Sequence, residues 1–199
     1  MKLKDITIKL YTDDTASQFI DAIAELRINV FREYPYLYDG DKVYENKYLA
    51  KFLAAEDSLI AIAFHGDKVV GALTGLPLSL EDQGITHPWT IRNLEINDKY
   101  YFSEALILKE FRGKGIGRAF FNVAESFVKS IDKYKAITFA TVVRDENHPH
   151  KPAGYKSPDG LWEHLGYTKT EDLVCNISWK EIGEKQKTNK PLLFWIKYN

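Results

Sequence analysis

Residues 101–121 join an apolar strand to a helix through a basic, glycine-rich turn, and read YFSEALILKEFRGKGIGRAFF. Glycines in such a turn allow a tight bend and bring backbone N–H groups close to a ligand. The N-terminus of the helix that follows favours negative charge at the same point. Arg112, Lys114 and Arg118 add positive charge. The segment therefore predicts an α/β unit whose turn binds a phosphate or pyrophosphate.

The spacing of the glycines narrows the ligand class. A P-loop requires GxxxxGK followed by Ser or Thr, which residues 112–117 (RGKGIG) do not contain. A dinucleotide fingerprint requires GxGxxG and an acidic residue about 20 positions later. Here the pattern is GxGxG led by Arg112. The alternative to a ligand-binding turn is a basic turn whose glycines serve packing only.

Composition limits the remaining possibilities. A chain of 199 residues with 45% hydrophobic content fits one domain over residues 1–199. The net charge of -1 argues against a nucleic-acid partner. The one cysteine, Cys175, rules out an internal disulfide and fits a reducing compartment. The first residues lack an apolar signal segment, and no apolar run approaches the ~20 residues of a membrane span, so we expect a cytoplasmic protein with no membrane partner.

Hydrophobic periodicity predicts an order of β-α-α-β-β-β-α-β-α-β-β. The expected strands cover residues 5–11, 58–64, 68–78, 101–108, 136–143, 167–179 and 191–197, and the last is expected to be an edge or inserted strand. The expected helices cover residues 15–32, 43–54, 116–131 and 159–165. Residues 80–98 are expected to be irregular and residues 144–158 to form a polar loop. Gly166 is expected to end the last helix in the left-handed conformation.

Two signatures in this order resemble the GCN5-related N-acetyltransferases, the GNAT family. Arg112, Gly115 and Gly117 match the family's loop, Arg or Gln, two residues, Gly, any residue, Gly or Ala. Residues 161–167 (LWEHLGY) look like the second signature, in which Trp162 stands where the family usually has Tyr. The resemblance covers residues 58–167 and implies an α/β (α+β) fold: a mixed, mostly antiparallel sheet flanked by helices on both faces.

The resemblance implies acetyl-CoA as cosubstrate and transfer of its acetyl group to a primary amine. The pantetheine arm would pair like an extra strand with the backbone of residues 106–108, and an N–H near Leu106 would polarise the thioester carbonyl. No metal is implied. The expected CoA-binding residues are Leu106, Ile107, Leu108, Arg112, Gly113, Lys114, Gly115, Ile116, Gly117, Arg118 and Asn147.

The attacking amine must lose a proton, because free amines are mostly protonated at pH 7. Glu104 is the candidate base, since many relatives carry an acidic residue there; the alternative is a solvated strand end or a salt bridge. Trp162 cannot donate a proton usefully to the departing thiolate. Tyr155 is the candidate acid in its place, and solvent is the alternative.

The amine acceptor, a small molecule or a peptide, is expected beneath the linker between the first two helices. Tyrosines and carboxylates of that linker can hold a cationic amine. The candidate acceptor-binding residues are Glu33, Tyr34, Tyr36, Tyr38 and, from the polar loop, His148. A metal role for His148 and His150 lacks a third ligand.

Two further interpretations remain open. A non-catalytic acyl-CoA-binding or regulatory module on the same fold would explain Trp162, whereas Glu104 beside an intact loop favours an enzyme. A nucleotidyl transferase would need a metal-binding acidic pair near the loop, which the sequence does not show. Cys175 is expected to be a core residue rather than a nucleophile. Phe194 and Trp195 either close the core or form a homodimer contact.

Overall fold

The structure, a computed structural model, describes residues 5–199, and these form a seven-stranded mixed sheet in the order β1-β2-β3-β4-β5-β7-β6. Pairing is antiparallel throughout, except between β4 and β5, which are parallel. The predicted fold class is confirmed. The strands are β1 (Thr7–Tyr11), β2 (Leu59–His65), β3 (Lys68–Pro77), β4 (Lys99–Ile107), β5 (Ala136–Val142), β6 (Thr168–Trp179) and β7 (Thr188–Tyr198).

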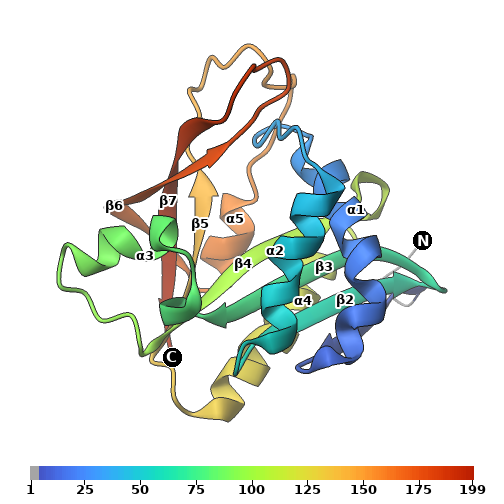
Figure 1. The fold of residues 1–199 in the computed structure, drawn as a ribbon, viewed down its shortest axis with the longest axis vertical. Coiled ribbons are helices and arrows are strands. Elements are labelled where there is room, and N and C mark those ends of the chain that lie inside the picture. The colour runs from blue at the N-terminus through green and yellow to red at the C-terminus, as the bar shows by residue number, and fades with distance from the viewer. Residues whose placement is uncertain (1–4) are drawn as a thin grey trace.

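Helices cover both faces of the sheet (Figure 1). One face carries α1 (Ile20–Phe31), α2 (Lys42–Ala54) and α3 (Gln83–Thr90), and the other carries α4 (Ile116–Ile131) and α5 (Asp159–His164). Short 3₁₀ turns are η2 (Asp14–Phe19), η3 (Leu78–Leu80) and η4 (Lys109–Phe111). The helix expected over residues 15–32 therefore begins as a 3₁₀ turn and becomes α-helical at Ile20.

Alternation along the strands divides the core between these two helical layers. On β2, Ala61 and Ala63 face the layer that contains α4, whereas Ile60 and Ile62 face α1 and α2. This follows from the two-residue period of side chains along a strand. Because both faces are covered, β2 and β3 are buried almost throughout, and the glycine-rich turn is held on a rigid framework.

One segment differs from expectation. Residues 80–98 were predicted to be irregular, but they contain α3, a helix that includes Pro88. Ile85, Pro88 and Trp89 fall on one side of this short helix and are buried against β6 and β7. Burial of that apolar side outweighs the backbone hydrogen bond that proline cannot donate.

The last strand, β7, was expected to be either an edge strand or an inserted strand. It is inserted, between β5 and β6. Phe194 and Trp195 on this strand are buried in the core, which settles their packing without bearing on dimer formation. Cys175, opposite Leu192 of β7, is buried as a free thiol, as predicted. No helix within residues 5–199 has the length and apolar character needed to cross a membrane.

Candidate active site

The site begins where the sheet opens between β4 and β5. These two strands pair only through residues 99–101 and 136–138, although β4 continues to Ile107 and β5 to Val142. The other edge of β5 pairs with β7 along the whole strand. The far part of β4 therefore has one edge without a strand partner among the described residues, and a strand-like ligand arm can pair there.

The ladder to β3 determines which backbone groups of β4 face this gap. Leu108 N donates to Val70 O at 3.0 Å. Bonded positions alternate along an antiparallel pair, so the backbone groups of Leu106 and Leu108 point towards β3. Those of Ala105 and Ile107 point into the gap, and Ile107 O accepts from Arg112 Nε at 2.9 Å.

The glycine-rich turn leads directly into α4. Gly113 and Gly115 have φ values of +72° and +87°, a region that glycine enters at little cost. Gly115 is the N-cap and offers no side chain to cap the helix. The N–H groups of the first turn of α4 therefore remain free for a ligand. A Cβ at Gly113 would meet nothing within 4 Å, so the turn borders open space. This geometry fits the diphosphate of acetyl-CoA.

The two basic side chains Arg112 and Lys114 of the turn have different partners. Arg112 forms two bonds with Glu33, Nη1 to Oε2 at 2.8 Å and Nη2 to Oε1 at 3.0 Å. Lys114 Nζ donates to Glu110 O and lies over the Phe111 ring. Arg112 thus links the turn to the linker after α1, while its backbone and Lys114 remain beside the helix N-terminus.

The two sequence signatures contact each other. A Cβ at Gly117 would lie 3.2 Å from Leu161 Cδ2, so glycine permits α4 to pack closely against α5. Trp162 packs against Phe139 and Trp195, with ring centroids 5.1 and 5.2 Å away. The residue that replaces the family's usual tyrosine is therefore half-buried against the core. Gly166 has φ +90°, which confirms the predicted left-handed helix end.

The linker between α1 and α2 covers the opening and is attached to the far half of the sheet. Asp39 N donates to Lys180 O at 2.9 Å, and Ile182 N donates to Leu37 O at 2.8 Å. Arg144, at the start of the polar loop, donates to Pro35 O at 2.6 Å. These bonds hold the candidate acceptor-binding residues in a fixed position.

Three of the predicted site residues come together at one end of this cover. Tyr34 contacts Tyr155 edge-on at 4.8 Å between ring centroids and lies 5.7 Å from the His148 ring. Burial raises the pKa of Tyr155, the Tyr34 hydroxyl raises it further, and Arg112 opposes the shift. Asn147 is exposed on the same loop, and its backbone N–H donates to Asp145 Oδ1 at 2.7 Å.

The other two linker tyrosines point elsewhere. Tyr36 packs against Phe31 and Trp179, and burial raises its pKa to about 12. Tyr38 turns towards α2, where its hydroxyl donates to Glu45 Oε1 at 2.6 Å. Burial and this contact raise the pKa of Tyr38. Both hydroxyls therefore stay neutral at physiological pH.

Glu104 lies in a buried charged cluster. Its side chain is 1% exposed and pairs through Oε2 with Arg27 of α1, which also pairs with Glu45. Glu104 Oε1 accepts no hydrogen bond from the residues that the structure describes. The salt-bridge alternative considered for Glu104 is therefore present, and Glu104 lies within β4 rather than at its start.

A β-bulge explains how Glu104 comes to face α1. Thr74 pairs with Glu104 and Gly75 with Phe102, so Ser103 is the extra residue on β4. Before the bulge, Phe102 faces the α4 layer; after it, Leu106 faces the α1 layer. The bulge brings Ser103 and Glu104 to the same face, because two residues there oppose one on β3.

Sequence reasoning missed Arg27, Arg144 and Glu81. Arg27 follows Leu26 within the apolar stripe of α1, and a charged residue at such a position is a signal of a buried ion pair. Arg144 and Glu81 lie in segments without regular periodicity, so their partners depend on tertiary contacts between distant parts of the chain.

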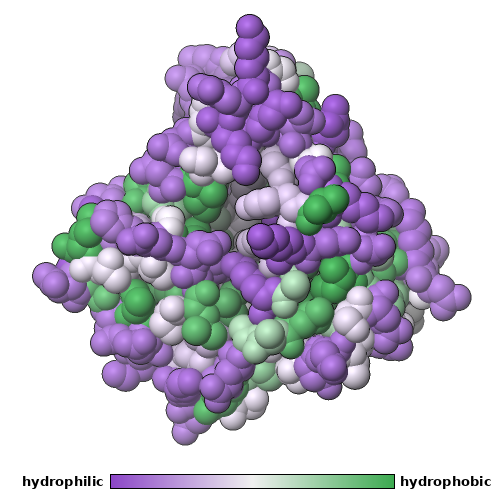
Figure 2. All heavy atoms as spheres, in the orientation of Figure 1, coloured by the Kyte–Doolittle hydropathy of each residue, from purple (hydrophilic) through white to green (hydrophobic). Residues whose placement is uncertain are grey.

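The surface is hollowed between α2 and β5, on the face that carries α1, α2 and α3 (Figure 2). Hydrophilic residues gather above this hollow, over the turn between β6 and β7 (Figure 2). The hollow therefore lies over the opening of the sheet, on the face opposite α4.

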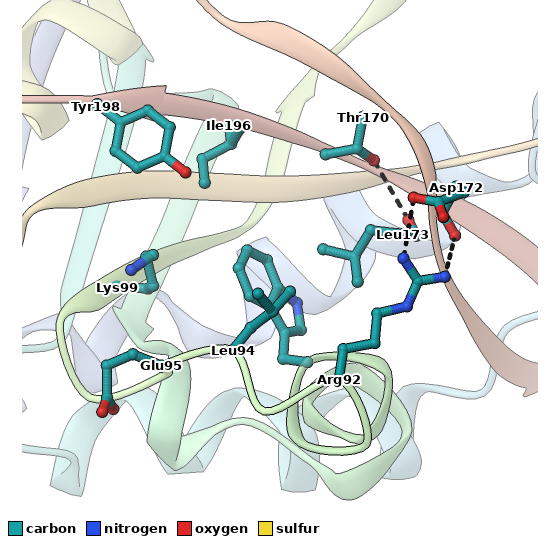
Figure 3. Close-up of a pocket in the computed structure, with 10 residues that line it drawn as sticks. Arg92, Leu94, Glu95, Lys99, Thr170, Asp172, Leu173, Ile196 and Tyr198 are labelled. Atoms are coloured by element: carbon teal, nitrogen blue, oxygen red, sulfur yellow. Dashed lines mark hydrogen bonds and ion pairs between the residues drawn. The ribbon is translucent and has the colours of Figure 1, made fainter.

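A separate cavity of about 260 Å³ lies beside α3, at the opposite end of β4 from Ile107. Figure 3 shows Arg92 reaching Asp172, with Nη1 2.9 Å from Oδ1, and Tyr198 and Lys99 on the other side. None of the predicted site residues lines this cavity.

An open parallel strand pair beside a glycine turn at a helix N-terminus is typical of α/β proteins that bind a phosphate-bearing ligand with an extended arm. The chain matches the Acetyltransferase (GNAT) family over residues 22–152 and belongs to that family. The family and fold support acyl transfer from acetyl-CoA. No curated protein sequence matches the chain.

Solved structures share the fold at low sequence identity. A ribosomal-protein-alanine N-acetyltransferase from Brucella melitensis is 13% identical, covers 97% of this chain and 99% of its own, and has a TM-score of 0.64. The protein yncA from Salmonella typhimurium, solved with its cofactor acetyl-CoA, is 13% identical over 98% and 94% of the two chains, with a TM-score of 0.60. A GNAT-family acetyltransferase from Streptococcus pneumoniae is 11% identical over 98% and 99%, with a TM-score of 0.59.

Proposed function

We propose that this protein is an N-acetyltransferase that moves the acetyl group of acetyl-CoA to a primary amine by direct attack in a ternary complex. The observation that carries the proposal is the end of β4–β5 pairing at Tyr101 and Thr138, which opens a gap along β4 as far as Ile107, beside the uncapped N-terminus of α4. A diphosphate at the helix and an arm along β4 would place a thioester inside the opening.

The turn would hold the diphosphate through backbone N–H groups from Arg112 to Arg118, with Lys114 and Arg118 adding charge. Ala105 and Ile107 offer the backbone groups that face the gap, and Asn147 would contact CoA from the polar loop. Acetyl-CoA supplies the acyl group, and the residues of β4 and α4 orient it.

The acceptor would enter beneath the α1–α2 linker. The ring of Tyr34 suits a cationic amine, and His148 lies beside it. Glu33, which pairs with Arg112, and Tyr36, which packs against Phe31 and Trp179, would line the entry. Tyr38 would contribute through the backbone of the linker, because its hydroxyl is bound to Glu45. A small-molecule or peptide amine fits this arrangement.

Proton transfer is assigned to two residues. Glu104 is one candidate base: it would draw a proton from the amine through a bridging water, since its Oε1 has no protein partner in the described part of the chain. Tyr155 would protonate the departing sulfur, because its raised pKa keeps the hydroxyl protonated.

Direct attack is favoured over a covalent enzyme intermediate by the state of Cys175. This cysteine is buried, and burial raises the pKa of its thiol to about 12. A thiol with such a pKa is a poor nucleophile at neutral pH.

Thiol release from acetyl-CoA with a panel of amines tests the proposal. We expect turnover with at least one primary amine and calorimetric binding of acetyl-CoA that is lost in Arg112→Glu/Lys114→Glu. Binding without turnover on any amine would favour the non-catalytic module, which the packing of Trp162 against the core also favours. No binding, and no effect of the double substitution, would contradict both.

A further inference from the structure

Another buried carboxylate, Glu81, lies on the same face of the sheet as Glu104. Glu81 follows η3, and its side chain is 3% exposed. Its Oε1 accepts from Ser103 Oγ at 2.6 Å, and its Oε2 accepts from Lys51 Nζ at 2.7 Å. Asp82 N also donates to Oε2, at 3.2 Å. A buried carboxylate held from two sides keeps a fixed geometry.

Of the residues that bond to Glu81, Ser103 is the one at the opening of the sheet. It is the extra residue of the β4 bulge and follows shortly after Tyr101, the last residue of β4 that pairs with β5. Its side chain is half-buried, unlike that of Glu104. Bulges commonly re-aim a side chain beside an active site. Ser103 therefore lies between the buried Glu81 and the gap that the reacting groups would occupy.

We propose, on the basis of the proposed function, that Ser103 and Glu81 form the proton-accepting pair for the acceptor amine. Ser103 Oγ contacts the amine nitrogen, and Glu81 is the final base. In this step an N–H bond of the ammonium breaks as a new H–Oγ bond forms on Ser103. The original Ser103 O–H bond breaks as Glu81 Oε1 gains a proton. No electron is transferred, and the neutral amine is left with a free lone pair for attack on the acetyl group.

The groups that face Glu81 suit this role. From α2, the ammonium of Lys51 holds Oε2 of Glu81, which leaves Oε1 to Ser103. Burial raises the pKa of Tyr48 and of Tyr101, with Glu81 adding to both, so these neighbours remain neutral. Asp82 is mostly exposed, 3.9 Å from Lys51, and is screened by solvent.

Glu104 differs from Glu81 in its connection to the gap. Its Oε2 pairs with Arg27, and within the described residues no hydroxyl links its other oxygen to the opening. Substitution of Glu81 and substitution of Glu104 should therefore affect catalysis differently, and comparing the two variants shows which carboxylate is the base.

The pH dependence of kcat/KM tests the inference, measured with acetyl-CoA and an amine that the wild type acetylates. We expect Glu81→Gln to lower kcat/KM about 100-fold or more at neutral pH, a usual size for loss of a general base. Its rate should then rise with pH only as free amine accumulates. Ser103→Ala should shift the profile in the same direction while it keeps the Glu81–Lys51 pair. Asp82→Asn, a matched change one position along, should stay within about twofold of wild type, because exposed charges contribute little.

Calorimetry with acetyl-CoA controls for folding, and each variant should bind it as the wild type does. The inference is overturned if Glu81→Gln and Ser103→Ala keep the wild-type rate and pH profile, or if Glu104→Gln alone removes the acidic limb. If Glu81→Gln does not fold, Ser103→Ala decides by the same criterion. A wild type without turnover on any amine would overturn the proposed function itself, which distinguishes the two failures.

Discussion

Gly115 shows how a single residue sets the chemistry of the turn. Its φ of +87° lies in the left-handed region, and it caps α4 without a side chain. Any other L-residue would add about 1–2 kcal/mol of backbone strain there. If the backbone at position 115 rotated to relieve this strain, the N–H groups of the first turn of α4 would point away from a bound diphosphate.

We therefore expect Gly115→Ala to weaken acetyl-CoA binding about tenfold or more, which corresponds to about 1.4 kcal/mol. Isothermal titration measures the dissociation constant. Gly154→Ala is the matched control, because Gly154 likewise has a positive φ, +71°, has no atom within 4 Å of its Cβ position, and lies in the polar loop. Equal affinities for the wild type and Gly115→Ala would contradict this account of the turn.

Tyr155 is assigned the role of acid, and its pKa sets the expected pH dependence. Burial raises this pKa, so the protonated hydroxyl is present at low pH and is lost only above about 10, the ordinary value for tyrosine. We expect Tyr155→Phe to lower kcat about tenfold, less than a typical acid, because a thiolate leaves readily. Steady-state kinetics between about pH 7 and 9 should show a constant ratio of wild type to variant. If the wild type and Tyr155→Phe had the same kcat at every pH, Tyr155 would not be the acid, and solvent would donate the proton.

At the scale of elements, the α1–β4 contact rests on the charged cluster of Arg27, Glu45 and Glu104. Breaking a buried ion pair by removing one partner costs about 3–5 kcal/mol, because the remaining charge is left without compensation. If Arg27, Glu45 and Glu104 are all replaced by neutral residues, no uncompensated charge stays buried.

Arg27→Met should therefore lower the free energy of unfolding by about 3–5 kcal/mol in urea. Arg27→Met/Glu45→Gln/Glu104→Gln should recover much of that loss. Arg32→Met is the control, since the Arg32 side chain is 56% exposed and its pair with Asp39 contributes about 1 kcal/mol or less. Equal losses in Arg27→Met and Arg32→Met would show that the cluster does not stabilise the fold.

Elements with strong periodicity could be predicted from sequence, and those set by distant partners could not. The helix over residues 116–131 was predicted, and α4 has these bounds, with Ile116, Phe120 and Ala124 buried. The helix α3 was missed because Pro88 argues locally against a helix, whereas burial against β6 and β7 decides otherwise. The bulge at Ser103 leaves no mark in the sequence, because it is defined by the register with β3.

The same division applies to the candidate site. The turn at residues 112–117 and the Gly166 helix end carry local signals, since left-handed positions favour glycine. The contact of Tyr34 with Tyr155 joins residues far apart in sequence, and no local pattern predicts it. The side-chain pairing of Glu104 with Arg27 likewise required the arrangement of α1 over β4.

Across the whole molecule, the sheet consists of two halves joined by a short parallel contact between β4 and β5. The α1–α2 linker spans the opening from the first half to the turn between β6 and β7, through Asp39 and Leu37. The central claim is that acetyl-CoA occupies the opening, with its diphosphate on α4 and its arm along β4.

Amide hydrogen exchange, resolved by residue with NMR and measured with and without acetyl-CoA, tests this claim most directly. The account predicts that the ligand slows exchange at Gly115, Ile116 and Gly117, and at Ala105 and Ile107, whose N–H groups face the gap. Leu106 and Leu108 should change little, because their N–H groups already bond to β3. Unchanged exchange at these positions, with protection appearing instead around the cavity beside α3, would contradict it.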